Sequence, residues 1–310
     1  MKTLYYSHDD YLKHDTGIGH PENARRLLAI DQALATPDFD DLVRMSAPLP
    51  DDILDKLALI HSQTMIKRVL HGIPSHGYHH FDGDTVASPG SKAAALRAVA
   101  AVCDAVDQVW HRQANRAFCA VRPPGHHAMP DHPMGFCLFN NVAIAAEYAR
   151  RHCGLTRVAI VDFDVHHGNG TQTAFYDQPQ VFYASTHQSP HYPGTGHSEE
   201  TGRGNIVNVP LPAGTAGEVF RARYQNIILP KLAAFKPQLL LLSAGFDAHR
   251  DDPLASLQLV EDDYRWLTRE LVAIAKTCCD GRIVSALEGG YDLKALAASV
   301  SEHLVALMAE

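Results

Sequence analysis

Residues 158–170, which read VAIVDFDVHHGNG, decide the fold class of this chain. The apolar run 158–161 is typical of a strand that is buried on both faces of a parallel sheet. Polar side chains follow at Asp162, Asp164 and His166, and open α/β sheets bind their ligands just past such strand ends. If the backbone stays extended, these alternate side chains point to one side, and a buried cluster of this kind needs a cation. The stretch therefore predicts half of a metal site.

Length and composition limit the classes of protein to which this chain can belong. The chain has 310 residues, 46% of them hydrophobic, which is enough for a large core, and we find no linker, repeat or low-complexity segment, so we expect one domain over 1–310. A net charge of −8 without a basic run argues against nucleic-acid binding. No apolar run predicts a signal peptide or a membrane span, and six cysteines without a CxxC pair are typical of a reduced, cytoplasmic protein.

Strands and helices alternate along the chain. We expect strands at 4–6, 117–121, 157–161, 181–185, 206–209, 238–243 and 283–287. We expect helices from about 20 (with Leu27, Leu28, Ile30 and Leu34 on its apolar face) and at 51–60, 62–70, 91–111, 139–153, 216–232, 261–277 and 292–308. The His- and Gly-rich segment 72–90 has no periodicity and is expected to be a long functional loop. The pattern predicts an α/β fold, a mostly parallel sheet with helices on both faces.

Four loops that each follow a predicted strand carry the chemistry. They contribute, in chain order, the pair His126 and His127 in RPPGHHA, the cluster around Asp164, then Asp247 in AGFDAHRDDPL and Tyr291 in EGGYD. Taken singly, an aspartate after a strand is usually a helix cap, and a tyrosine usually a packing residue. Their occurrence at corresponding strand ends predicts one shared site.

These motifs resemble those of the zinc-dependent histone deacetylase family, which also includes acetylpolyamine amidohydrolases. The resemblance runs nearly end to end, through HPE (from His20), RPPGHHA, GFCLFNN, VDFDVHHGNGTQ, YPGTG, SAGFDAHRDDPL and LEGGYDL, and it is nearer to the class II branch than to class I. It implies a single-domain, arginase-like α/β fold. It also implies one catalytic Zn²⁺ per chain, held by Asp164, His166 and Asp247.

The ligand set indicates what else the reaction needs. Two carboxylates and one imidazole leave a fourth position for water or substrate, as a catalytic zinc requires. Because two carboxylates cancel the charge of Zn²⁺, we expect a second electrophile and a strong base nearby. Tyr291 fits the electrophile, since its phenol can donate to a developing oxyanion, and Gly289 and Gly290 let its loop approach closely.

The histidine pair supplies the proton chemistry. The resemblance pairs His126 with Asp162 and His127 with Asn169. A carboxylate partner favours imidazolium, whereas an amide leaves the ring nearer to neutral. We therefore expect His127 to be the general base toward the attacking water, and His126 mainly to stabilise charge.

The resemblance also implies a substrate tunnel. Gly135, Phe136 and Tyr192 match its walls, where two aromatic faces would enclose the methylene chain of an acyl-lysine. Asp84 and Thr85 match the rim position at which relatives hold the substrate backbone. Relatives also bind K⁺ through backbone oxygens near Asp162, Asp164, His166 and Ser185, which no sequence pattern establishes by itself.

Competing functions differ in particular residues. A binuclear manganese ureohydrolase needs further bridging aspartates, and SAGFDAH offers only Asp247. A non-catalytic acyl-lysine binder should have lost Tyr291 or a metal ligand, and neither is missing. An acetylpolyamine amidohydrolase stays the alternative, although Leu254 stands where polyamine-selective relatives carry a glutamate. We expect hydrolysis of acyl-lysine in peptides or proteins, and the sequence leaves the physiological substrate, the acyl group and the oligomeric state open.

Overall fold

Eight parallel strands form the central layer of the structure, a computed structural model that describes residues 2–309. Their order across the sheet is β2 (Leu42–Ser46), β1 (Thr3–Ser7), β5 (Arg116–Cys119), β10 (Ile283–Leu287), β9 (Leu239–Ala244), β6 (Val158–Asp162), β7 (Val181–Gln188) and β8 (Ile206–Leu211). Every neighbouring pair is parallel. The prediction of an α/β fold built on a parallel sheet is confirmed.

Burial explains which strands the sequence reveals. Every residue of β6 and β9 is buried, because helices cover both faces of the sheet, and each strand begins with four consecutive apolar residues. The edge strand β2, by contrast, is exposed at Val43 and Arg44 and carries no such run. Sequence analysis therefore missed β2.

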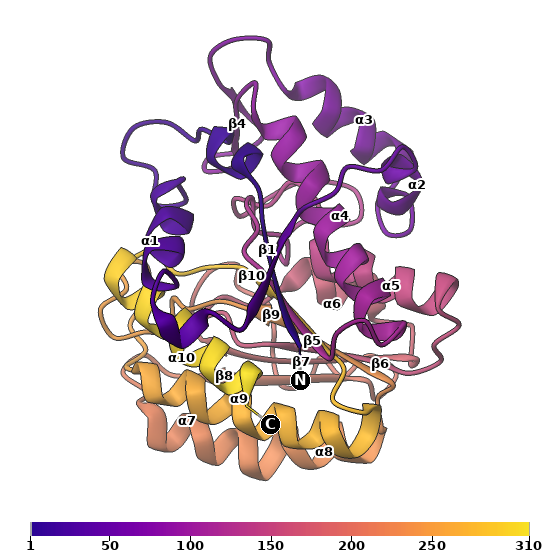
Figure 1. The fold of residues 1–310 in the computed structure, drawn as a ribbon, viewed down its shortest axis with the longest axis vertical. Helices are drawn as coiled ribbons and strands as arrows, with labels where there is room; N and C mark the ends of the chain where they lie inside the picture. The colour runs from indigo at the N-terminus through magenta and orange to yellow at the C-terminus, as the bar shows by residue number, and fades with distance from the viewer. Residues whose placement is uncertain (1, 310) are drawn as a thin grey trace.

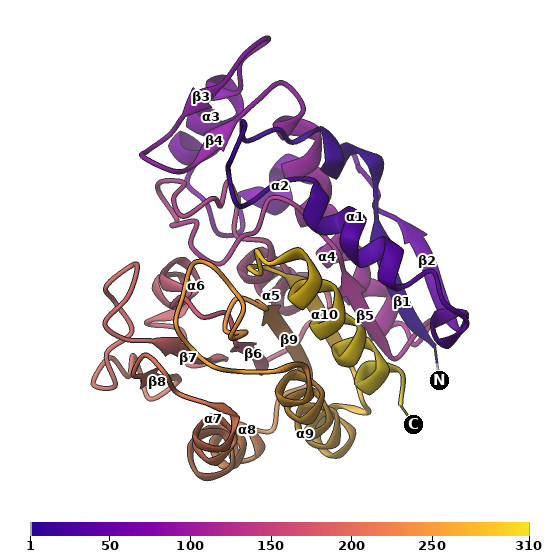
Figure 2. The same ribbon diagram turned by 90° about the vertical axis from the view of Figure 1, so that its left-hand side faces the viewer.

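Helices cover both faces of the sheet. On one face α4 (Ser91–Trp110) packs against α5 (Asn141–His152), and on the other α10 (Leu293–Met308) packs between α1 (Arg25–Ala33) and α9 (Glu261–Cys279). Figure 2 shows α5 behind the strands and α10 in front of them, and Figure 1 shows α9 grouped with α7 and α8 at the bottom of the view. The shorter helices are α2 (Ile53–Leu57), α3 (Gln63–Gly72), α6 (Asn169–Phe175), α7 (Gly217–Arg223) and α8 (Leu229–Phe235), with 3₁₀ turns at Asp9–Lys13 and Pro37–Phe39.

Three helices depart from the sequence prediction. The first begins only at Arg25, and Leu28 on it is 52% exposed rather than part of the apolar face. The helix expected over 51–60 is reduced to α2. The helix expected over 216–232 extends to residue 235 but contains a π-helical turn at Tyr224–Ile228. Pro230, in the turn that follows, has no backbone N–H to donate to the regular α-helical hydrogen bonds.

The segment 72–90 is not entirely irregular. It contains a short antiparallel hairpin of β3 (His79–His80) and β4 (Val86–Ala87), in which His79 pairs with Ala87. The hairpin places Asp84 and Thr85 beside the Phe136 backbone, whose N–H lies 3.2 Å from the Thr85 hydroxyl. Within residues 2–309, no helix is long and apolar enough to cross a membrane.

The strand order explains why the polar loops meet. The four chemistry-bearing loops follow β5, β10, β9 and β6, and these strands are consecutive neighbours in the sheet. Because all of them run parallel, their carboxyl ends lie at one edge, where Asp162 stands in register with Ser243, and Ser243 with Ala286. The topology thus gathers side chains that are up to 165 positions apart in the sequence, from His126 to Tyr291.

Candidate active site

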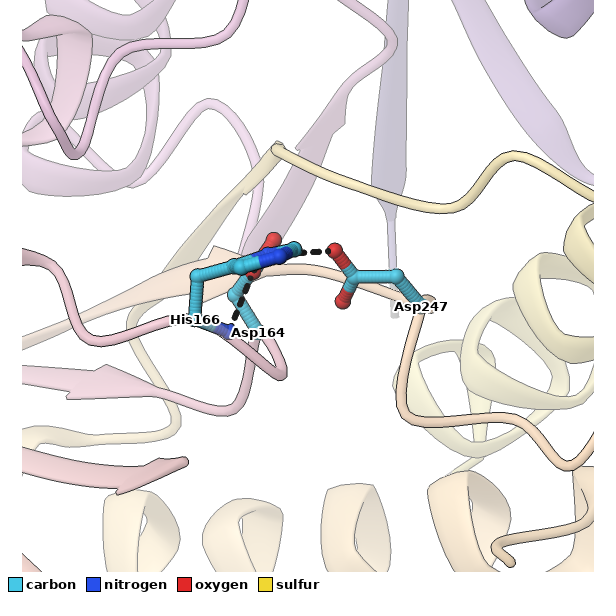
Figure 3. Close-up of side chains that lie close together, drawn as sticks. All are labelled: Asp164, His166 and Asp247. Atoms are coloured by element: carbon cyan, nitrogen blue, oxygen red, sulfur yellow. Dashed lines mark hydrogen bonds and ion pairs between the residues drawn. The ribbon is translucent and has the colours of Figure 1, made fainter. Parts of the chain in front are cut away.

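Asp164, His166 and Asp247 form a buried cluster that could hold a metal ion. One ligand atom from each lies within 4.8 Å of the others. Nδ1 of His166 is 3.0 Å from Oδ1 of Asp164 and 3.1 Å from Oδ2 of Asp247. Figure 3 shows the imidazole with a carboxylate on each side, the second contributed by the loop after β9. The structure therefore brings the three predicted ligands together.

Backbone donors hold both carboxylates in place. Oδ2 of Asp164 accepts the N–H of Gly289 at 2.8 Å, and Oδ1 of Asp247 accepts the N–H of Val165 at 2.8 Å. A Cβ at Gly289 would lie 2.1 Å from Oδ2 of Asp247, so only glycine permits this approach. Such outer contacts orient metal ligands in advance of binding.

Asp162 does not join this cluster. The chain leaves the extended conformation after Asp162, the last residue of β6, so the alternate side chains do not all point to one side. Its Oδ2 instead accepts hydrogen bonds from His126 and from the Tyr183 hydroxyl, both at 3.0 Å. The expectation that Asp162, Asp164 and His166 share one direction is corrected, and the third ligand comes from Asp247.

The donor set fits a divalent cation. Burial, together with the charge of Asp164, raises the pKa of Asp247 to about 7, so two carboxylates in this position repel one another without a cation. Three protein ligands of this type match a catalytic rather than a structural zinc site, which has four. Within the described residues 2–309, no second group of three such side chains could hold an ion.

The histidine pair has two different partners, as expected. Nδ1 of His126 is 3.0 Å from Asp162, and Nδ1 of His127 is 2.7 Å from the side-chain oxygen of Asn169. Burial disfavours charge on His126, but the carboxylates of Asp162, Asp164 and Glu288 outweigh it and raise its pKa to about 10. Burial, together with the charges of His126 and His166, holds the pKa of His127 well below its usual value. The two adjacent rings are therefore charged and neutral respectively near pH 7.

A cavity of about 230 Å³ lies over this cluster. Its lining includes most of the predicted site residues, namely Asp84, His126, His127, Gly135, Phe136, His166, Tyr192, Leu254 and Tyr291. Pro124 and His191, which the sequence did not single out, also line it, as does Gly289 of the Tyr291 loop. One pocket thus contains the metal ligand His166, the neutral histidine and the tyrosine.

The wall at Gly135 and Phe136 is built on unusual backbone. Both residues have positive φ, 57° and 67°, and a Cβ at Gly135 would lie 2.5 Å from the ring of His127. Thr85 is fully buried and lies behind this wall, where its hydroxyl accepts the N–H of Phe136. That position differs from the rim position that the resemblance implied, because Thr85 supports Phe136 instead of facing the cavity.

Tyr291 is held by residues that the sequence did not reveal. Its N–H donates to Asp252 at 2.7 Å, and the Arg26 guanidinium lies 5.0 Å from its ring centroid. Arg26 is fully buried and donates to the carbonyls of Glu288 and Gly290, on either side of the first glycine of the loop. Asp252 could have been suspected from its place in the RDDPL motif, but Arg26 is 264 positions from Gly290 and no local signal relates them.

Two further side chains were missed. Glu288 is fully buried and accepts the N–H groups of Gly125 and His126, so it fixes the loop that carries the histidine pair. His191 stacks on the ligand His166 with ring centroids 5.0 Å apart, and its Nε2 donates to the Leu254 carbonyl at 3.1 Å. Glu288 is the first residue of the EGGYD motif and His191 directly precedes Tyr192, and these positions were the only signals in the sequence.

A parallel α/β sheet whose carboxyl edge carries an Asp–His–Asp cluster, a histidine pair and a tyrosine defines a metal-dependent hydrolase. Residues 20–307 match the histone deacetylase domain, and the chain belongs to this family. It is 40% identical over 310 residues to histone deacetylase 10, chloroplastic, of Oryza sativa subsp. japonica, covering 94% of this chain and 70% of the relative.

Two other comparisons agree with this assignment. The chain is 37% identical over 278 residues to the histone deacetylase-like amidohydrolase of Pseudomonas aeruginosa, covering 87% of this chain and 71% of that protein. The crystal structure of the HDA15 HD domain superposes with a TM-score of 0.93 at 34% identity, covering 99% of this chain and 88% of that one. The protein is a hydrolase of the deacetylase and amidohydrolase type that characterises the family.

Proposed function

We propose that this protein is a zinc-dependent deacylase that hydrolyses the amide of acyl-lysine in peptides or proteins, and that residues 1–310 form one catalytic domain. The observation that carries the proposal is that one cavity is lined by His127, His166 and Tyr291 together with the aromatic side chains of Phe136 and Tyr192. A narrow cavity of this type suits a methylene chain ending in an amide at the metal cluster.

Zn²⁺ is the proposed cofactor, one per chain, with Asp164, His166 and Asp247 as its ligands. When bound, it would polarise the substrate carbonyl and lower the pKa of water in the cavity. The mixed carboxylate and imidazole set is suited to zinc and leaves a position open. A potassium ion near Asp162 and Ser185 stays a prediction from the family resemblance.

The proposed roles of the histidines follow from their charge. His127 has its Nδ1 hydrogen directed at Asn169, so its Nε2 is the nitrogen available to accept a proton from the attacking water. The same nitrogen would later donate that proton to the leaving amine. His126, held as imidazolium beside Asp162, stabilises the negative charge that develops in the transition state.

Tyr291 is the proposed second electrophile. Burial is the main reason that its pKa lies well above the usual value, so its hydroxyl keeps its proton and can donate to the oxyanion. The hydrogen bond to Asp252 and the contact with Arg26 fix its loop, so that little reorganisation is needed during the reaction.

Substrate choice depends on the mouth of the cavity. Leu254 lines both the 230 Å³ cavity and an adjoining surface hollow of about 720 Å³ that Tyr291 and His20 also line. An apolar residue there suits a peptide backbone better than the distal ammonium of a polyamine. Asp84, also in the lining, is the proposed acceptor for substrate N–H groups, whereas Thr85 supports Phe136 from behind.

The second candidate function is that of an acetylpolyamine amidohydrolase. The carboxylate of Asp84 in the cavity lining favours it, because a carboxylate attracts the ammonium group of a polyamine. The deciding experiment loads the purified protein with Zn²⁺ and measures kcat/KM for acetyl-lysine peptides, longer acyl-lysine peptides and acetylated polyamines. We expect acyl-lysine peptides to be hydrolysed faster than polyamines. Hydrolysis of neither amide class, with zinc bound, would overturn the proposal.

The proposal extends to binding partners and location. Acyl-lysine peptides or proteins, or small acetylated amines, are the proposed binding partners, with no nucleic acid and no membrane. A cytoplasmic location is proposed from the free cysteines and the composition, although two plant relatives are described as chloroplastic.

A further inference from the structure

Both ends of the Asn169 side-chain amide make polar contacts. Its oxygen accepts from Nδ1 of His127 at 2.7 Å. Its nitrogen lies 3.2 Å from the sulfur of Met129 and 3.3 Å from the sulfur of Met134. Each of the two amide hydrogens thus has one thioether as its acceptor.

The chemistry of sulfur makes this arrangement directional. A thioether accepts hydrogen bonds weakly and donates none, so it can face the amide nitrogen but gains nothing from the amide oxygen. With two sulfurs on one side, the amide of Asn169 turns its oxygen toward His127. The ring then carries its hydrogen on Nδ1, which leaves Nε2 free to accept a proton.

The backbone segments that carry Asn169 and Met129 pack closely on one another. A Cβ at Gly170 would lie 2.2 Å from the carbonyl oxygen of Ala128, so the start of α6 packs directly on the loop of the histidine pair. The N–H of Met129 donates to the carbonyl of His132, and that of Cys137 to the carbonyl of Met134. Met129 and Met134 are both partly exposed, whereas Asn169 is buried.

We propose that Met129 and Met134 are positioning residues for the reaction, because their sulfur atoms hold the Asn169 amide in the orientation that His127 requires, and that they form an oxidation-sensitive site. The proposal rests on the proposed function of His127 as general base. Neither methionine lines the cavity, so each acts through Asn169.

Oxidation would act on the same contacts. A hydroperoxide transfers one oxygen to a thioether: the O–O bond breaks, an S–O bond forms, and the peroxide is reduced to water or an alcohol. An oxygen added to the sulfur lone pair that faces Asn169 would displace the amide from its 3.2 Å contact. Met129 and Met134 are both partly exposed, and methionine sulfoxide reductases can restore the thioether.

A double-mutant cycle with Asn169→Asp tests the positioning role. The carboxylate in Asn169→Asp has two equivalent oxygens, so one of them faces His127 whichever way the group is rotated. The methionines are therefore not needed to orient it. Met129→Leu/Met134→Leu keeps the apolar volume but removes both acceptors. When Asn169 is present, we expect the double substitution to lower kcat about three- to tenfold with KM nearly unchanged. In the Asn169→Asp protein, we expect the same double substitution to lower kcat by less than about twofold.

Hydrogen peroxide provides a test on the unaltered fold. We expect kcat of the zinc-loaded wild type to fall as peptide mass spectrometry detects oxygen on Met129 or Met134, and to recover with methionine sulfoxide reductases. The matched control Met45→Leu/Met308→Leu, which removes two other partly exposed methionines, should be inactivated like the wild type. Met129→Leu/Met134→Leu keeps every cysteine and should resist.

The outcomes are distinguishable. An equal loss of kcat in the Asn and Asp backgrounds, or no loss in either, would overturn the positioning role while leaving the deacylase function intact. Equal peroxide sensitivity of wild type and Met129→Leu/Met134→Leu would assign inactivation to other groups and overturn the oxidation site. A wild type that hydrolyses neither acyl-lysine nor acetylpolyamine would remove the function and this inference together.

Discussion

Gly245 packs so closely on Asp164 that a Cβ at position 245 would lie 2.1 Å from the Oδ2 atom of that ligand. A second metal-bridging aspartate two residues before Asp247, as a binuclear ureohydrolase would need, therefore does not fit here. Because of this contact, the described residues at this edge of the sheet provide ligands for one metal ion. The expected ratio is therefore one metal ion per chain.

The purified protein should bind one Zn²⁺ per chain. Asp247→Ala or His166→Ala should abolish metal binding and activity, because two remaining ligands hold zinc poorly. Elemental analysis and activity are the measurements, and Asp251→Ala, an exposed aspartate four residues after Asp247, is the matched control. Two metal ions per chain, both lost on mutation, would contradict the mononuclear assignment.

Tyr291→Phe should keep structure and zinc while kcat falls by roughly two to three orders of magnitude, the scale associated with one oxyanion donor. The physical reason is that the carboxylates of Asp164 and Asp247 offset the charge of the metal. Metal content and kcat are measured together, with Tyr176→Phe as an exposed control. A variant that retains more than half of the wild-type rate would show that the metal alone polarises the carbonyl.

Leu254→Glu should shift selectivity toward acetylated polyamines. One charge-assisted contact of about 1.5–3 kcal/mol corresponds to a change of roughly ten- to a hundredfold in the ratio of kcat/KM for polyamine over acetyl-lysine peptide. Leu254→Gln has the same shape without the charge and should leave the ratio close to that of wild type. If Gln and Glu act alike, or if the wild type already prefers the polyamine, the acyl-lysine assignment loses its main support.

His303 should make the folded state less stable in acid. Burial lowers its pKa to about 3, whereas in the unfolded chain it titrates near 6.5. Below pH 6.5 the unfolded chain therefore binds a proton that the folded protein does not, so stability is complete above pH 6.5 and falls as the pH drops toward 3. At pH 5 this single group costs about 2 kcal/mol.

The measurement is the free energy of unfolding between pH 7.5 and about 5, compared with His303→Gln, which keeps polar groups facing Ser285 and Thr268 but does not titrate. The variant should have the shallower pH dependence, although it is less stable at neutral pH. Parallel curves would show that His303 does not titrate as described. Metal loss in acid affects both proteins alike and cancels in the comparison.

The sequence by itself determined the class of fold and the chemical groups of the site. The runs in β6 and β9 are apolar throughout because both faces of a parallel strand are buried, so periodicity reveals them directly. Local motifs likewise contained the ligands Asp164 and His166, because two side chains of one short loop stay close in any fold.

The tertiary structure decided which loops meet and what supports them. Strand order alone makes β5, β10, β9 and β6 neighbours, and this order brings Asp247 and Tyr291 to the loop of Asp164. Contacts such as Arg26 with Glu288 and Gly290 join residues that share no local pattern, so no periodicity could predict them. The partners of Asp162, His126 and Tyr183, likewise come from other strands and their loops, so only the assembled sheet brings them to it.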